Sequence, residues 1–196
     1  MTVITTFSTS LDGFIADPTD DVGPLFDWHS AGDVEVRPAG YPLALRMSEG
    51  SARHWQEMTD RAGAFVCGRR LFDHTNGWGG TPPLGMPTFV VSHRPPPENW
   101  PPHPDAPYTF VTDGLESAIA QAKAVAGDRV VSVAGANLAQ QALKLGLVDE
   151  VWLDLVPVLL GKGIRYFDDA GQVMLEDPQV IEGTRATHLR YRVRRG

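Results

Sequence analysis

The sequence predicts an α/β fold, a three-layer α/β/α sandwich with a mainly parallel central sheet and an antiparallel C-terminal edge. Short apolar and β-branched runs alternate with stretches of helical periodicity over most of the chain. Two final strand-like runs then follow each other across a turn at Gly183, with no helix between them. The 196 residues, 42% of them hydrophobic, suit a single domain, 1–196, around one core.

The expected strands are short apolar or β-branched runs that end at turn residues. They cover residues 3–9, 64–67, 87–92, 108–111, 129–133, 150–155, 180–182 and 188–193. Helices are expected where apolar residues recur at helical spacing, with Ser51 and Asp113 as capping residues. They cover 51–62, a short stretch from 69 to about 76, 113–127 and 136–145. Residues 17–42 and the proline-rich 95–107 are expected to be surface loops without regular structure.

The composition excludes several classes of function. The net charge of −7, without a basic stripe, argues against nucleic-acid binding. Cys67 is the single cysteine, and the six histidines show no ligand spacing, so neither a disulfide framework nor a metal site is expected. No apolar stretch is long enough to cross a membrane, and the N-terminus lacks the pattern of a signal peptide, so the expected location is the cytoplasm.

The junction after the strand at 64–67 combines a glycine with two arginines. Gly68, Arg69 and Arg70 stand where this strand ends and a helix begins. The first turn of a helix leaves backbone N–H groups unpaired and carries partial positive charge, and arginine adds fixed charge. The junction can therefore bind a phosphate group, although the same residues also fit an ordinary strand–helix turn.

A second junction follows the strand at 87–92. Ser92, His93 and Arg94 place a hydroxyl, an imidazole and a guanidinium together. This trio suits a phosphate monoester, such as the ribose 2′-phosphate that distinguishes NADPH from NADH. It also fits a plain polar strand end before a proline loop.

A third junction follows the strand at 129–133 and opens a helix. Small residues there allow a pyrophosphate to approach the backbone closely, and the helix start supplies donors. Its residues are Gly135, Ala136, Asn137 and Leu138. The alternative is a tight connection in which Asn137 is only a helix cap. All three junctions lie at carboxyl ends of strands, the edge where open α/β sheets bind ligands, so together they favour a nucleotide site.

These three junctions, together with the segment 10–16 (SLDGFIA), resemble the reductase domain of the riboflavin-biosynthesis bifunctional protein and its dihydrofolate-reductase-like relatives. The segments 146–151 (GLVDEV) and 155–163 (LVPVLLGKG) and Phe167 add to this resemblance. It runs from Val3 to about Phe167, with every motif in the family's order. One departure is the absence of the H-x-E and P-C-x-x-C zinc signature of the deaminase that precedes the reductase in the bifunctional protein.

The resemblance implies a dihydrofolate-reductase-like fold with NADPH as hydride donor. It implies that the Gly68 junction holds cofactor phosphate, that the Ser92 junction faces the 2′-phosphate, and that the Gly135 junction lies along the pyrophosphate and nicotinamide. It further implies that Ala16 lies near the nicotinamide and that Asp12, our candidate catalytic residue, faces the substrate.

Three residues are candidates for the substrate pocket. Asp12 follows from the resemblance, although it can instead form a local turn with Gly13. Glu49 stands near the place of the carboxylate that dihydrofolate reductases carry on their first helix. Trp78 follows the helix after Gly68 and could wall a planar substrate, although tryptophan more often anchors a core or a loop.

The expected activity is hydride transfer from NADPH to a C=N or C=O bond of a small heterocyclic substrate, similar to a pyrimidinone or a pterin. Two alternatives stay open, which are a non-catalytic NADP-binding protein and a true dihydrofolate reductase. The expected partner is a small-molecule substrate, and the apolar C-terminal strands favour a homodimer.

Overall fold

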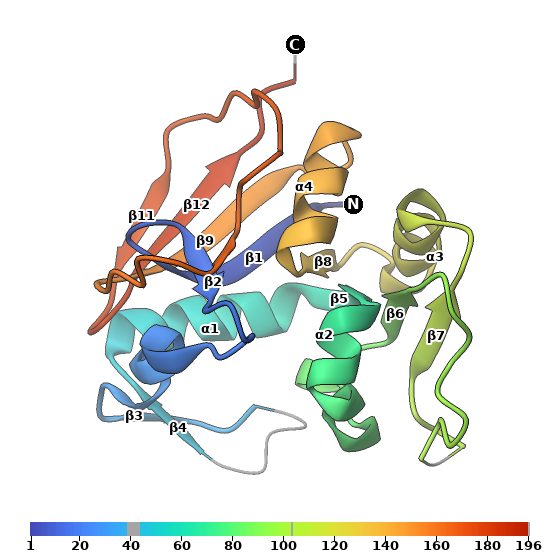
Figure 1. Ribbon diagram of the computed structural model, residues 1–196. Coiled ribbons are helices and arrows are strands. Elements are labelled where there is room, and N and C mark those ends of the chain that lie inside the picture. Colours follow the sequence, from blue (N-terminus) through green and yellow to red (C-terminus); the bar gives the residue numbers. More distant parts are fainter. Residues whose placement is uncertain (39–43, 103, 196) are drawn as a thin grey trace.

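Eight strands form one central sheet in the computed structural model, which describes residues 1–38, 44–102 and 104–195 (Figure 1). The strands lie in the order β11-β12-β9-β1-β8-β5-β6-β7. Their bounds are β1 Val3–Ser10, β5 Ala62–Gly68, β6 Thr88–Val91, β7 Tyr108–Val111, β8 Val130–Ala134, β9 Glu150–Val156, β11 Gln179–Glu182 and β12 Thr187–Arg192. Neighbours from β9 to β7 are parallel, and β12 and β11 add an antiparallel edge beside β9. The predicted fold class is therefore confirmed.

Helices cover both faces of this sheet. One face carries α3 (Leu115–Ala126) and α4 (Ala136–Lys144), and the other carries α1 (Glu49–Arg61) and α2 (Arg69–His74). Alternate residues of β5 show the two layers of core, because Val66 packs with α3 and α4 whereas Cys67 packs with α2. Strand β8 is buried at every position, as expected for a parallel strand covered on both sides.

The segment 17–42 contains regular structure in its described part, so the expectation of an irregular loop was wrong. A 3₁₀ helix covers Gly23–Ser30, and β3 (Val34–Val36) pairs with β4 (Leu45–Met47). Leu25 and Trp28 are three residues apart and both fully buried, because the three-residue repeat of a 3₁₀ helix places them on one side. Residues 39–42 of this segment lie outside the described residues.

The expectation that Ser51 and Asp113 cap helices was also wrong. Helix α1 begins at Glu49 with Ser48 in the N-cap position, and Ser51 lies inside the first turn, where its hydroxyl bonds to His188. Helix α3 begins at Leu115, and Gly114 is its N-cap, with φ +105°. Asp113 therefore stands one residue too early to cap α3.

Short elements complete the chain around this sheet. Near the carboxyl end of β1, β2 (Phe14–Ala16) pairs with β10 (Ile164–Arg165). Two more 3₁₀ turns cover Asn76–Gly80 and Pro83–Gly85. Within the described part of 95–107 there is no helix or strand, as expected. In the part of the chain that the structure describes, no helix is both long and apolar enough to span a membrane.

Candidate functional site

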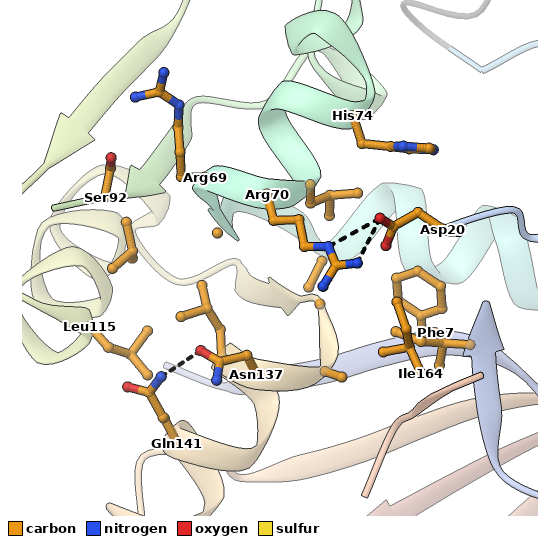
Figure 2. Close-up of a pocket in the computed structure, with 18 of the residues that line it drawn as sticks. Phe7, Asp20, Arg69, Arg70, His74, Ser92, Leu115, Asn137, Gln141 and Ile164 are labelled. Atoms are coloured by element: carbon orange, nitrogen blue, oxygen red, sulfur yellow. Dashed lines mark hydrogen bonds and ion pairs between the residues drawn. The ribbon is translucent and has the colours of Figure 1, made fainter. Parts of the chain in front are cut away.

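A cavity of about 580 Å³ opens at the carboxyl ends of β5, β6 and β8 (Figure 2). Its volume lies in the range of sites for cofactors and drug-sized ligands. All three strand-to-turn junctions from the sequence lie in its wall, as does Ala16. The residues named for the cofactor that line it are Ala16, Gly68, Arg69, Arg70, Ser92, His93, Arg94, Gly135, Ala136, Asn137 and Leu138.

Two glycines leave parts of the cavity wall without a side chain. Gly135 is the N-cap of α4 and has φ +93°, a conformation that residues with a Cβ rarely adopt. Gly68 has φ −82°, and a Cβ added to it would meet the nearest atom of Leu138 at 3.7 Å, an ordinary contact. Neither the backbone conformation nor the packing therefore requires a glycine at 68. Its lack of a side chain instead leaves space in the cavity.

The start of α4 offers unpaired backbone N–H groups to the cavity. No side chain caps this helix, so the alternative that Asn137 is a helix cap was wrong. The amide oxygen of Asn137 instead accepts a hydrogen bond from Gln141 Nε2 at 2.6 Å, one turn further on. The first N–H groups of a nine-residue helix therefore remain available to an anion.

Three arginines supply positive charge to the same wall. Arg69 Nε lies 2.7 Å from Asp73 Oδ1, and Arg94 Nη2 lies 3.4 Å from the other oxygen of Asp73. Arg70 pairs instead with Asp20, at 2.7 Å. Each guanidinium thus already has a carboxylate partner, and a phosphate would join or replace it.

The opposite end of the cavity is apolar. Phe7 of β1 and Ile15 of β2 form its wall together with Ile164 of β10 and Val22. The cavity therefore combines a cationic end rich in backbone donors with an apolar end, as an elongated ligand with a charged half and an aromatic half would require.

The three residues expected in the substrate pocket do not line this cavity. Asp12 Oδ1 accepts hydrogen bonds from Ser10 Oγ (2.6 Å) and the Leu160 amide, and Oδ2 accepts one from the Gly161 amide (2.7 Å). The Ser10 bond is the main reason why the pKa of Asp12 lies below its usual value. Asp12 thus ties the turn after β1 to the segment after β9.

Glu49 and Trp78 lie elsewhere as well. Glu49 lines a separate surface groove between α1 and β3. Trp78 adopts φ +49° in a 3₁₀ turn and packs edge-on against Phe65, with ring centroids 5.8 Å apart. The structure therefore brings the residues predicted for the cofactor together, but not those predicted for the substrate.

Comparisons with known proteins agree with this geometry. The family model described as the RibD C-terminal domain matches residues 1–189. The chain belongs to this family. Membership of this family implies that the protein is an oxidoreductase. No curated protein sequence matches the chain.

Solved structures similar to this RibD C-terminal domain share its fold. A protein from Shewanella sp. PV-4, provisionally assigned to riboflavin biosynthesis, is 24% identical, with a TM-score of 0.67 and full coverage of both chains. Dihydrofolate reductase from Enterococcus faecalis, complexed with NADP(H) and RAB-propyl, is 13% identical (TM-score 0.61), with 99% of this chain and 97% of that one covered. The deaminase/5-amino-6-(5-phosphoribosylamino)uracil reductase from Thermotoga maritima is 15% identical (TM-score 0.62), and the match covers 98% of this chain but 56% of that one.

Sequence reasoning did not name 12 of the 23 residues that line the cavity of this RibD C-terminal domain. Among them are Phe7, Asp20, Val22 and Ile164, which come from three segments in which the sequence analysis identified no binding junction. Ile164 reaches the cavity because β10 pairs with β2, a contact between residues about 150 positions apart. A signal did exist for Phe7, since alternation along β1 places it on the face opposite Ile4.

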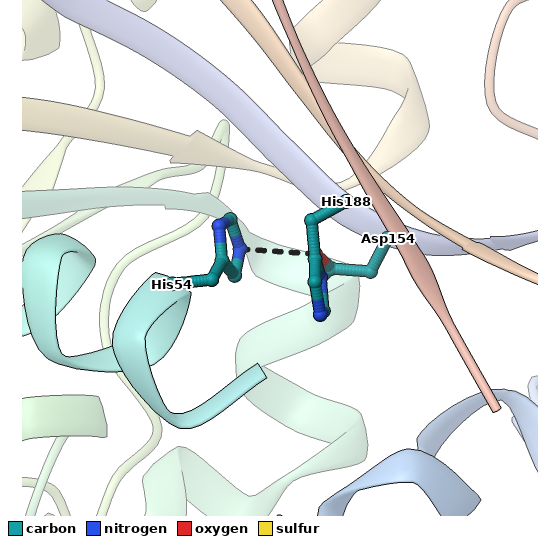
Figure 3. A group of neighbouring side chains, drawn as sticks. All are labelled: His54, Asp154 and His188. Carbon is teal, nitrogen blue, oxygen red and sulfur yellow. Dashed lines mark hydrogen bonds and ion pairs between the residues drawn. The ribbon is translucent and has the colours of Figure 1, made fainter. Parts of the chain in front are cut away.

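A buried polar cluster lies on the α1 face of the sheet, among residues that do not line the cavity (Figure 3). Asp154 Oδ1 lies 2.7 Å from His188 Nδ1 and 3.1 Å from His54 Nε2. His188 Nε2 bonds to Ser51 Oγ at 2.9 Å, and Arg190 Nη2 lies 2.8 Å from His54 Nδ1. Burial alone would raise the pKa of Asp154, but hydrogen bonds from the two histidines hold it well below its usual range.

The same cluster has the composition of a metal site, yet its hydrogen bonds oppose one. Arginine can only donate, so Arg190 requires His54 Nδ1 to be an acceptor, and the proton of the neutral ring must then sit on Nε2. That protonated nitrogen is the one that faces Asp154 and would have to bind the ion. The arrangement therefore fits a proton-bearing network better than a metal centre.

A fall in pH below about 6.5 is expected to destabilise the protein. Burial lowers the pKa of His29 to about 4, and its Nε2 has no hydrogen-bond partner among the described residues. The unfolded chain takes up the proton near pH 6.5, whereas the native state resists it until about pH 4. The free energy of unfolding should therefore fall by about 3 kcal/mol across this window.

Urea denaturation at pH 7.5 and pH 4.5 measures this loss. His29→Phe keeps an aromatic ring against Trp28 and cannot titrate, so it should flatten this pH dependence. An equally steep dependence in His29→Phe would contradict the role of His29.

Proposed function

We propose that this protein is an NADPH-dependent reductase that transfers a hydride to a C=N or C=O bond of a small heterocyclic substrate. The observation that carries the proposal is that eleven residues from four separate segments line one cavity at the carboxyl edge of a parallel sheet. Family membership supports an oxidoreductase, and the reductase named for the Thermotoga maritima relative suggests a pyrimidinone substrate.

The residues present fit such a cofactor. The bare backbone at Gly135 and the unpaired N–H groups of α4 suit the pyrophosphate, and Ser92, His93 and Arg94 suit the 2′-phosphate. The apolar end around Phe7 would receive the nicotinamide and exclude water from it. When bound, NADPH supplies the hydride, and the protein orients it against the substrate.

A reductase needs a source for the proton that accompanies the hydride, whereas a protein that only binds NADP does not. Among the described residues of the cavity wall, Asp20 is the one with an acidic side chain, and it is paired with Arg70. The proton would therefore come from water, from the substrate itself or from one of the histidines of the wall, His74 or His93. The same observation also favours the second candidate, a protein that binds NADP without catalysis.

Titration of NADPH fluorescence and an assay of NADPH oxidation separate these functions. A reductase should bind NADPH and oxidise it in the presence of 5-amino-6-(5-phosphoribosylamino)uracil or a related pyrimidinone. Binding without oxidation of any pyrimidinone or pterin would favour the NADP-binding protein. Turnover of dihydrofolate alone would favour the folate enzyme, and absence of binding would refute the cofactor assignment. The homodimer and the cytoplasmic location stay predictions.

Arg94→Met is expected to weaken NADPH binding by about tenfold while changing NADH binding by less than twofold, because the lost charge would face only the 2′-phosphate. Dissociation constants for both cofactors from fluorescence titration test this. Arg129→Met, which removes an exposed arginine outside the cavity wall, is the matched control. Equal weakening of both cofactors would place Arg94 away from the 2′-phosphate.

A further inference from the structure

Arg70 differs from the other two arginines of the cavity because its guanidinium is paired with a carboxylate, Asp20, that itself lines the cavity. Its Nη2 and Nε lie 2.7 and 3.1 Å from the same oxygen of Asp20, Oδ2 (Figure 2). This Nε–Nη2 edge is one of those with which arginine grips a carboxylate or a phosphate. A carboxylate of the protein therefore occupies the place that a ligand phosphate would take.

Asp20 is carried by a short loop that is braced by its own hydrogen bonds. Asp17 Oδ1 accepts bonds from the Thr19 amide (2.6 Å), the Thr19 hydroxyl (2.7 Å) and the Asp21 amide (3.0 Å). Asp20 itself has φ +70°, an uncommon conformation for a residue other than glycine. The loop that follows β2 is thus held in one conformation, and it directs the Asp20 side chain toward Arg70 of α2.

The other two cavity arginines are paired in a different way. Arg69 and Arg94 share Asp73, which lies on α2 itself, four residues after Arg69, and is not part of the cavity wall. Their carboxylate partner can stay in place when a ligand enters the cavity. Asp20, by contrast, lines the cavity, and so does Val22 from the same loop.

We propose that Asp20 is a built-in competitor for phosphate at Arg70, which the pyrophosphate of the cofactor displaces when it enters. The proposal rests on the proposed function, because that function supplies the anion. Displacement frees the loop 17–23 from α2 and with it Val22, which lines the apolar end. Before this displacement, Asp20 shields Arg70 from anions that bind weakly. Only a ligand that also contacts the rest of the cavity displaces it.

The test compares Asp20→Asn with Asp21→Asn. Asparagine tolerates a positive φ better than most residues, so Asp20→Asn removes the charge with little change to the backbone. Asp21 lies in the same loop without a cationic partner among the described residues, and its Oδ1 accepts only the Gly23 amide. The two variants thus lose the same charge from neighbouring positions, and only one loses the Arg70 ion pair.

Binding of NADPH and of inorganic pyrophosphate is measured by titration calorimetry. Asp20→Asn should bind both about three- to fivefold more tightly than the wild type, the range that one partly exposed ion pair can supply. Asp21→Asn should stay within about twofold of the wild type. In an Arg70→Met background the effect of Asp20→Asn should vanish.

A second readout follows Arg70 directly, through the Nε–Hε signal in a ¹H–¹⁵N spectrum. Pyrophosphate should shift this signal strongly in the wild type, and Asp20→Asn alone should shift it before any ligand is added. Unchanged or weaker binding of pyrophosphate by Asp20→Asn would overturn the proposal that Asp20 competes with phosphate at Arg70. Failure of every variant to bind NADPH, with tighter pyrophosphate binding in Asp20→Asn, would refute the proposed cofactor and leave the competitor standing.

Discussion

Replacing Asp154 by asparagine is expected to lower the free energy of unfolding by about 3–5 kcal/mol, the loss typical of a buried ionic network that loses one partner. Asp154 is buried, and one of its oxygens faces both His188 and His54. Asparagine can keep an acceptor oxygen toward both ring nitrogens, but it removes the negative charge from the buried cluster.

Urea denaturation with a two-state fit measures this loss, and an unchanged m-value shows that the same surface unfolds. Asp169→Asn is the matched control, because it makes the same chemical change in an exposed pair with Lys144 and should cost less than about 1 kcal/mol. Equal losses in the two variants would mean that the buried cluster contributes no more than a surface ion pair.

Gly135→Ala is expected to weaken NADPH binding by at least about tenfold, provided that α4 supplies charge-assisted hydrogen bonds to the pyrophosphate. An alanine at φ +93° is strained, and relief of the strain must move the junction between β8 and α4. The first N–H groups of α4 would then turn away from the phosphate position.

Gly127→Ala separates this local effect from general strain. Gly127 follows α3, has φ +60°, and its added Cβ meets nothing within 4 Å, as at Gly135, but it does not line the cavity. Both variants should lose similar stability by urea denaturation, and only Gly135→Ala should lose NADPH affinity in fluorescence titration. Equal affinity of the two variants would remove the start of α4 from the binding site.

The sheet and the cofactor side of the site were accessible from the sequence because their signals are local. A β-branched run that ends at a glycine or a hydroxyl specifies both a strand and its carboxyl end, and parallel strands bring those ends to one edge. Gly68, Ser92 and Gly135 were found in this way. The family resemblance added Ala16, which no local pattern singled out.

The remaining features depend on contacts between distant residues. Asp12 looked like a substrate-facing carboxylate, but its partners are amides almost 150 residues away, which no spacing could reveal. Trp28 gave no strand or helix signal that distinguished it from a loop residue, yet it is fully buried and bonds to Ser8. The ion pair between Asp20 and Arg70 likewise joins residues 50 positions apart.

The antiparallel C-terminal edge makes the order of synthesis matter for folding. Strand β9 places Asp154 in the interior, but its partner His188 lies on β12, 34 residues later in the chain. The same strand carries Arg190, which bonds to His54. Helix α1 is synthesised much earlier, but its packing is also incomplete until β12 is present, because Ser51 and His54 bond to that strand. A nascent chain in which β12 has not yet been synthesised therefore exposes a carboxylate without its His188 partner beside apolar surface, so the core can be completed only after that strand has left the ribosome.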